Sequence, residues 1–398
     1  MLSYVQVSHM MSGKPSRCHI WSILSFVFIS VLLSSCSGEK EHGMHRGEKA
    51  LGTLTMTLDS MVVNADTTSL QGNFVLADEG LIFIDRGYSK AYIYSPDSGE
   101  LLKAHLGRGQ GPNEVNGAME GFTVSPADTS VWIMDSMMGI YEYSPKNATA
   151  DYTTRIDFGW GDEANMVIDK PGVYAFLDLT GFGATVTQIN DSTMLIPVNI
   201  LKRNLSVIDE DYYNRGHIFG EVDIPTLKVR KVTGKFPEFF KEHPCPALGY
   251  FDYEYEPESD RVFVTYGADS LIYCYQYPDS LLFTFGFEPE GIKREYPFGY
   301  DVDFNEFVEN PERIGFNTRL MYDREKKLYL RVSIKERKSY DSVVQVYDKD
   351  FNLVGELDLP PMFVLLGKHG SKYYGIRRDP IEYEDKSEFV FYTFTLEP

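Results

Sequence analysis

The sequence has few cysteines and none of the short motifs that mark common catalytic sites. Only four cysteines occur among 398 residues, which excludes the dense disulfide framework of small secreted domains. The patterns H-E-x-x-H, G-x-S-x-G and C-x-x-C do not occur, so the usual signatures of zinc proteases, α/β-hydrolases and thiol redox enzymes are missing. We therefore predict no catalytic residue, no metal site and no cofactor.

Basic residues are scarce relative to acidic ones. From Cys36 onward the chain has 36 Lys and Arg against 58 Asp and Glu, a formal charge of −22. Nucleic-acid binding depends on Lys and Arg that neutralise phosphates, so we predict no nucleic-acid partner. The same balance disfavours close contact along an anionic lipid surface. The acidic residues are dispersed, which is typical of solvated faces.

The N-terminus has the order of a bacterial secretory signal. Lys14 and Arg17 precede the apolar segment Ile20–Leu33, which is shorter than the roughly 20 residues that a transmembrane helix needs. The Leu-Ser-Ser-Cys sequence that ends at Cys36 resembles a lipobox, in which cleavage precedes the cysteine and the thiol receives a diacylglycerol. We predict a lipoprotein signal peptide over residues 1–35 and a membrane attachment through a lipid on Cys36. An ordinary signal peptide is the alternative.

The residues after the signal bear on location. Residues 36–50 are polar, contain glycine and have no apolar period, so we predict a flexible tether. Ser37 follows the cysteine where an aspartate would favour inner-membrane retention, which points to the outer membrane. Glu39 and Glu41 resemble part of the export signal of Bacteroidota surface lipoproteins. The periplasmic and cell-surface sides both stay open.

Only two cysteines remain in the predicted folded domain, residues 51–398. These are Cys245 and Cys274. An oxidising periplasm permits a disulfide between them, provided that the fold brings their Cα atoms close enough. Two buried free thiols are the alternative.

A strand-rich repeat dominates this domain. Residues 81–106 contain three short apolar runs separated by polar turns, and the plan returns at 130–158, 261–287, 327–359 and 373–396. One more strand candidate precedes each copy. Four strands per unit, at a spacing of about 40–50 residues, are the signature of a β-propeller blade. The 27 Tyr and 26 Phe residues also favour strands.

The number of blades follows from the remaining segments. Residues 165–234 are less regular and supply strands for about one more blade. We therefore predict an all-β, six-bladed β-propeller, with seven blades as the alternative. Residues 51–58 form a spare strand, which we expect to close the ring by completing the last blade and hiding its edge. Two β-sandwiches would fit the hydrophobic alternation but not the regular unit length.

A glycine-rich loop carries a family resemblance. Residues 106–115, LGRGQGPNEV, resemble the G-x-G-Q-G-P-x-E segment after the third strand in Bacteroidota six-bladed, TolB-like propeller lipoproteins. Asn113 stands where glycine is commoner in that family. The resemblance implies a fold and a compartment but no catalytic residues, because these families are largely of unknown function. A phosphate-binding loop is not expected, since no G-K-[ST] opens a helix here.

Propeller topology predicts one face that gathers loops. The loop between the second and third strands and the loop to the next blade leave a blade on the same side, which in the first unit means 86–90 and 107–116. Mixed aromatic, amide and guanidinium groups suit sugars or peptides. For the tryptophan and the methionines, packing between blades is the alternative. The residues predicted at this rim are Arg86, Tyr88, Arg108, Gln110, Met137, Met138, Trp160 and Tyr296.

These observations favour a binding or scaffold module for an envelope protein or a glycan. The alternative is a glycan-active hydrolase or lyase with carboxylates at the propeller mouth. Asp301 with Asp303, or Glu288 with Glu290, would be candidate pairs. The enzyme hypothesis requires two inward carboxylates separated by about 5 Å or by about 6.5–9.5 Å.

Overall fold

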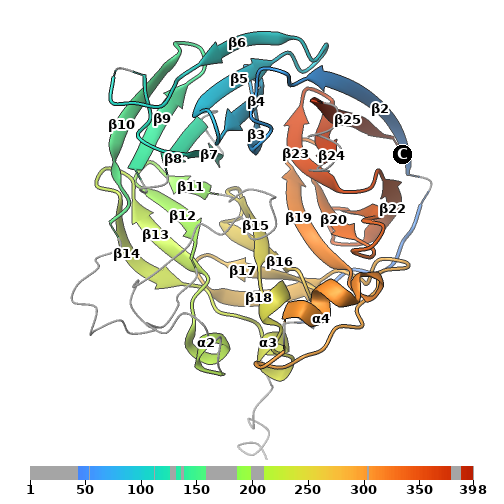
Figure 1. The fold of residues 1–398 in the computed structure, drawn as a ribbon. Coiled ribbons are helices and arrows are strands. Elements are labelled where there is room, and N and C mark those ends of the chain that lie inside the picture. Colours follow the sequence, from blue (N-terminus) through green and yellow to red (C-terminus); the bar gives the residue numbers. More distant parts are fainter. Residues whose placement is uncertain are drawn as a thin grey trace, which may run out of the picture. The chain divides into compact units, whose positions relative to one another are not determined.

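Six four-stranded blades stand around a ring (Figure 1). The innermost strands of successive blades contact one another all the way round, in the order β3, β7, β11, β15, β19, β23 and back to β3. This confirms the predicted six-bladed propeller. The computed structural model describes residues 44–52, 54–111, 113–125, 131–135, 139–157, 186–198, 210–302, 304–377 and 387–397.

The central strands of the blades are apolar because both of their faces are buried. In β4, Leu81 and Phe83 pack toward the last blade, whereas Ile82 and Ile84 pack toward the second blade. Among the described residues, six apolar clusters fill the six interfaces between neighbouring blades. A strand enclosed on both sides appears in the sequence as a continuous apolar run rather than as an alternation.

The first three blades follow the chain from the inner to the outer strand. The inner strands of the second and third blades pair in parallel over two residues, so these two blades share one eight-stranded sheet. The third blade lies within the segment predicted to be less regular. The strands are β3 (Gly72–Ala77), β4 (Gly80–Asp85), β5 (Lys90–Tyr94) and β6 (Leu101–His105); β7 (Met119–Ser125), β8 (Val131–Asp135), β9 (Gly139–Ser144) and β10 (Thr149–Arg155); and β11 (Val186–Asn190), β12 (Thr193–Pro197), β13 (Phe219–Asp223) and β14 (Lys228–Thr233).

The fourth and fifth blades keep the same order, and the sixth takes its outer strand from the N-terminal side. Their strands are β15 (Phe251–Glu256), β16 (Arg261–Tyr266), β17 (Ile272–Gln276) and β18 (Ser280–Phe285); β19 (Phe316–Asp323), β20 (Leu328–Ile334), β21 (Ser342–Tyr347) and β22 (Leu353–Leu359); and β23 (Phe363–His369), β24 (Lys372–Arg377), β25 (Glu388–Glu397) and β2 (Thr55–Asn64).

Strand β2 closes the ring, as we predicted for the spare N-terminal strand. It pairs antiparallel with β25 along its whole length, from Thr55 opposite Glu397 to Asn64 opposite Glu388. The strand begins and ends later than the predicted residues 51–58. This pairing covers the edge of β25, which would otherwise be free to pair with another chain.

Residues 44–52, here called the strap, lie along the outer edges of two blades. Strand β1 (Met44–His45) pairs in parallel with β18 of the fourth blade. Further on, Ala50 N donates to the Leu353 carbonyl of β22 at 2.9 Å. The structure thus places residues 44–50, part of the predicted tether, against two blades. Residues 36–43 lie outside the described part of the chain.

Three short helices cover part of the third and fourth blades. Tyr213 and Phe240, from α2 and α3, are buried in the apolar cluster between these blades. No helix within the described residues is long and apolar enough to cross a membrane. The helices are α2 (Glu210–Arg215), α3 (Glu238–Glu242) and α4 (Phe304–Glu309), with 3-10 turns at Pro246–Leu248 and Pro311–Arg313.

The two domain cysteines are buried free thiols, so the disulfide between Cys245 and Cys274 does not form in this structure. Cys274 lies on β17 and packs into the cluster between the fourth and fifth blades. Its strand neighbours Tyr273 and Tyr275 point to the opposite face, into the cluster that contains Cys245. The sheet of the fourth blade therefore lies between the two thiols.

Candidate functional site

The predicted loop face exists in the first blade. The last residue of β4, Asp85, pairs with the first residue of β5, and the last residue of β6, His105, pairs at the same end of the sheet. The loops that follow these two strands therefore leave the blade on one side. This confirms that the 86–90 and 107–116 loops share a face, which we call the loop face.

Buried aspartates shape the turns after the second strands of three blades. Asp85 accepts hydrogen bonds from the backbone of Ser69 and Tyr88 at 2.7 and 2.8 Å. Asp135 and Asp269, in the second and fourth blades, each accept one from the backbone of their own turn, at 2.8 and 3.0 Å. We did not predict this role, although an aspartate directly after the LIFI and VWIM runs marks two of the positions.

The glycine-rich loop is organised by one carboxylate. Glu114 accepts a hydrogen bond from Gly111 N at 2.7 Å. A Cβ at Gly109 would lie 2.0 Å from a Glu114 oxygen, and one at Gly111 would lie 2.9 Å from it. Asn113 has a φ of 63°, a left-handed conformation that Asn adopts more readily than most residues other than glycine. The second and third glycines of the motif G-x-G-Q-G-P-x-E thus have a structural explanation, because they make room for its glutamate.

An open hollow of about 460 Å³ lies beside this loop. The loop contributes one wall, and strands β9 and β10 of the second blade contribute the other. Tyr152 is 53% exposed, and its ring leans against Tyr141 with the ring centroids 5.1 Å apart. The lining residues are Gln110, Gly111, Asn113, Glu114, Asn116, Tyr141, Ala150, Asp151 and Tyr152.

The structure brings together some of the predicted rim residues. Arg86, Tyr88, Arg108 and Gln110 are exposed on the two loops of the loop face. Of these four, Gln110 lines the hollow. The predicted residues Met137, Met138 and Trp160 lie outside the described residues.

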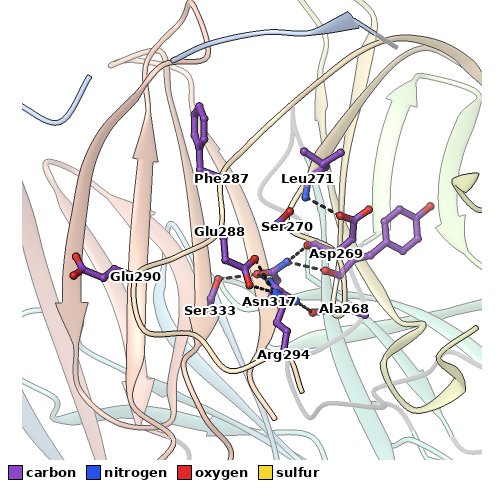
Figure 2. A network of polar contacts seen from close by, with 12 residues as sticks. Ala268, Asp269, Ser270, Leu271, Phe287, Glu288, Glu290, Arg294, Asn317 and Ser333 are labelled. Carbon is purple, nitrogen blue, oxygen red and sulfur yellow. Dashed lines mark hydrogen bonds and ion pairs between the residues drawn. The ribbon is translucent and has the colours of Figure 1, made fainter. Parts of the chain in front are cut away.

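Tyr296 does not lie at the rim, because it is only 5% exposed. Its hydroxyl donates to the Ala268 carbonyl at 3.1 Å and accepts from Arg294 at 2.9 Å. Arg294 also contacts Glu288 and Asn317, and Figure 2 shows these groups converging between the fourth and fifth blades. Burial raises the pKa of Tyr296. The residue therefore holds the long connection after β18 and is not available to a ligand.

The predicted carboxylate pair Glu288 and Glu290 is not a catalytic dyad. Both Glu288 oxygens lie 2.8 Å from Arg294 Nε. Glu290 stands apart from this network (Figure 2), and its backbone N–H binds Glu356. For the second predicted pair, Asp303 lies outside the described residues.

A different carboxylate pair lies on the inner strand of the fourth blade. Asp252 and Glu254 are two residues apart on β15 and so share one side of the strand. Arg319 of the neighbouring inner strand donates to Asp252 at 2.9 Å and lies 3.9 Å from a Glu254 oxygen. The second Asp252 oxygen accepts from Leu320 N at 2.7 Å. Sequence reasoning missed this cluster among the 58 acidic residues.

Of the two carboxylates, Glu254 has the weaker ion pair. Its side chain is 22% exposed and its one ion pair among the described residues is the 3.9 Å contact with Arg319. Burial raises the pKa of Glu254 to about 8, and the negative charge of Asp252 adds to the rise while Arg319 and Arg324 oppose it. Glu254 can therefore hold a proton at neutral pH.

The closed ring of six blades and the exposed loops at one end define the class of protein, a six-bladed β-propeller. The chain belongs to the family described as Domain of unknown function (DUF4221), whose model matches residues 48–358.

A solved structure agrees with this fold. A member of the same family from Bacteroides vulgatus is 14% identical over 86% of this chain and 98% of its own, with a TM-score of 0.64. A protein from Bacteroides fragilis is less similar, at 11% identity over 89% of this chain and 100% of its own, with a TM-score of 0.46. Only the first likeness supports a shared fold. A comparison with curated proteins finds no match.

Proposed function

We propose that this chain is a lipid-anchored propeller of the cell envelope that acts as a binding or scaffold module for a protein or a glycan. A lipid on Cys36 would attach it to the outer membrane, on the periplasmic or the cell-surface side. The signal-like N-terminus and the polar residues after it support this location. The resemblance to TolB-like lipoproteins of Bacteroidota supports it as well.

The loop face carries the binding proposal. Four side chains are exposed on these loops: Arg86, Tyr88, Arg108 and Gln110. The Asp85 carboxylate binds the backbone of the first loop, and the Glu114 carboxylate binds the backbone of the second. Loops held in one conformation lose little entropy when a partner binds. A rigid scaffold that presents polar and aromatic loop residues is the usual arrangement of a recognition surface.

The alternative, a glycan-active hydrolase or lyase, has one observation in its favour. Asp252 and Glu254 form a carboxylate pair that faces Arg319 of the fifth blade. Their Cα atoms are about 7 Å apart on a regular strand, and Glu254 can be protonated like a general acid. Both oxygens of Asp252 already accept hydrogen bonds, however. A carboxylate held in this way is a poor nucleophile or base, so the binding module is the better conclusion.

One experiment tests the proposal on the full chain. The tagged protein is crosslinked in intact Gram-negative cells, extracted with detergent and captured, and the same preparation is applied to an array of oligosaccharides. We expect the wild type to capture a specific protein or to bind a specific glycan. The double variant with Arg86→Ala and Arg108→Ala should give a weaker capture or binding signal. The Cys36→Ala variant should no longer occur in the membrane fraction, but it should still bind its glycan on the array. Hydrolysis or elimination on a glycan panel that Glu254→Gln abolishes would overturn the proposal.

A further inference from the structure

The hollow beside the glycine-rich loop has no cationic lining. Its charged residues are Glu114 and Asp151, and neither Lys nor Arg lines it among the residues that the structure describes. Asp151 is exposed, and its side chain points to the opposite face of β10 from Tyr152. One Glu114 oxygen is held by Gly111 N. An anionic ligand would meet the Glu114 carboxylate here without a compensating positive charge, so phosphate, sulfate and uronate groups are disfavoured.

The aromatic wall of the hollow is an exposed ring with a fixed orientation. Tyr152 is 53% exposed on the outer strand β10, and Tyr141 supports it in an edge-on arrangement at 64°. Tyr141 is itself fixed, because its hydroxyl donates to Asp135 at 3.1 Å and accepts from Asn116 N at 3.4 Å. A supported aromatic face is a surface on which the C–H side of a sugar ring can rest.

The opposite wall supplies planar polar groups. Gln110 and Asn113 are exposed carboxamides on the loop, each able to donate and to accept. Their backbone is held by the Val115 anchor, which is fully buried and whose N–H donates to the Gly107 carbonyl at 2.8 Å. Paired hydroxyl groups on a sugar match amide and carboxylate side chains, which bind two neighbouring oxygens in one plane.

We propose that this hollow binds a neutral saccharide, with a sugar ring stacked on Tyr152 and its hydroxyl groups bound by Gln110 and Asn113. The volume of about 460 Å³ is within the range of small-ligand sites. The inference rests on the proposed binding function and names the ligand class of one part of the loop face.

The test uses the full chain in detergent on an array that carries three probe sets. These are neutral hexose and N-acetylhexosamine oligosaccharides, hexuronate-containing oligosaccharides and sulfated oligosaccharides. We expect binding to members of the neutral set. Tyr152→Ala should weaken it at least tenfold and Gln110→Ala several-fold. The matched control is Leu102→Ala, which removes a side chain of equal exposure, 53%, from the outer strand of the first blade and should leave binding unchanged.

The outcomes separate this inference from the broader proposal. Preference for hexuronate-containing or sulfated probes, or neutral binding that Tyr152→Ala leaves intact, would overturn the saccharide site while the binding module stands. A crosslinked protein or peptide partner without any glycan binding would do the same. If the protein binds neither a protein nor a glycan, both the saccharide site and the binding module are overturned. Thermal melting of each variant shows whether a loss reflects unfolding.

Discussion

At the scale of single residues, the inner-strand glutamate contributes to how stability depends on pH. Glu254 has a folded-state pKa of about 8 against an ordinary value of 4.5. Between these values the folded chain holds a proton that the unfolded chain has released, so the unfolded state binds fewer protons. Stability therefore falls as pH rises through this window, by at most about 5 kcal/mol for this residue.

Replacing Glu254 by Gln should remove this contribution to the pH dependence. Gln resembles the protonated acid, so the free energy of unfolding of Glu254→Gln should match the wild type near pH 5 and exceed it by about 2–4 kcal/mol at pH 8. Urea unfolding at the two pH values measures the difference. Glu142→Gln changes an exposed carboxylate of β9 and should have no effect at either pH. Equal destabilisation by Glu254→Gln at both values would contradict the assignment.

At the scale of elements, the glycine-rich loop depends on a close fit between backbone and carboxylate. A Cβ at Gly109 would overlap a Glu114 oxygen, whereas a Cβ at Gly107 would meet nothing within 4 Å. The sequence predicted a glycine-rich connection between blades, and the structure confirms it. The sequence did not show what Gly109 and Gly111 make room for, because it is a side chain folded back over the same loop.

Gly109→Ala should therefore release the loop, with Gly107→Ala as its matched control. Displacing Glu114 removes its bond to Gly111 and should lower the free energy of unfolding by about 1 kcal/mol. Amide hydrogen exchange over residues 107–116 should become faster in Gly109→Ala and stay unchanged in Gly107→Ala. If both variants exchange like the wild type, Glu114 does not hold this loop.

At the scale of the whole molecule, the strap extends the ring closure to the outer edges of the fourth and fifth blades. Met44 pairs with Phe283 and Ala50 binds Leu353, partners that lie more than two hundred residues apart in sequence. Gly47 lies between these contacts with a φ of 80°, and a Cβ there would lie 2.0 Å from the Phe351 carbonyl oxygen. The atoms that this Cβ would meet belong to the Phe351 backbone, which cannot move aside as a flexible side chain could.

Gly47→Ala should loosen the strap. The left-handed conformation alone costs a non-glycine residue about 1–2 kcal/mol, and the overlap with Phe351 adds to this. We expect faster limited proteolysis within residues 44–52 and a lower melting temperature. Gly52→Ala is the control, because its nearest neighbour would lie 3.9 Å away. Equal protease resistance in the two variants would show that the strap does not depend on this turn.

The sequence by itself determined the propeller and its closure by an N-terminal strand, and it favoured six blades over seven. These follow from short-range patterns, namely apolar runs of strand length, polar turns and a regular unit length. Only the tertiary structure decided that Cys245 and Cys274 are separated by a sheet, that Tyr296 is buried and that Asp252, Glu254 and Arg319 meet. Each of these depends on which face of a strand a residue occupies and on which blade lies beside it, and a local pattern contains neither.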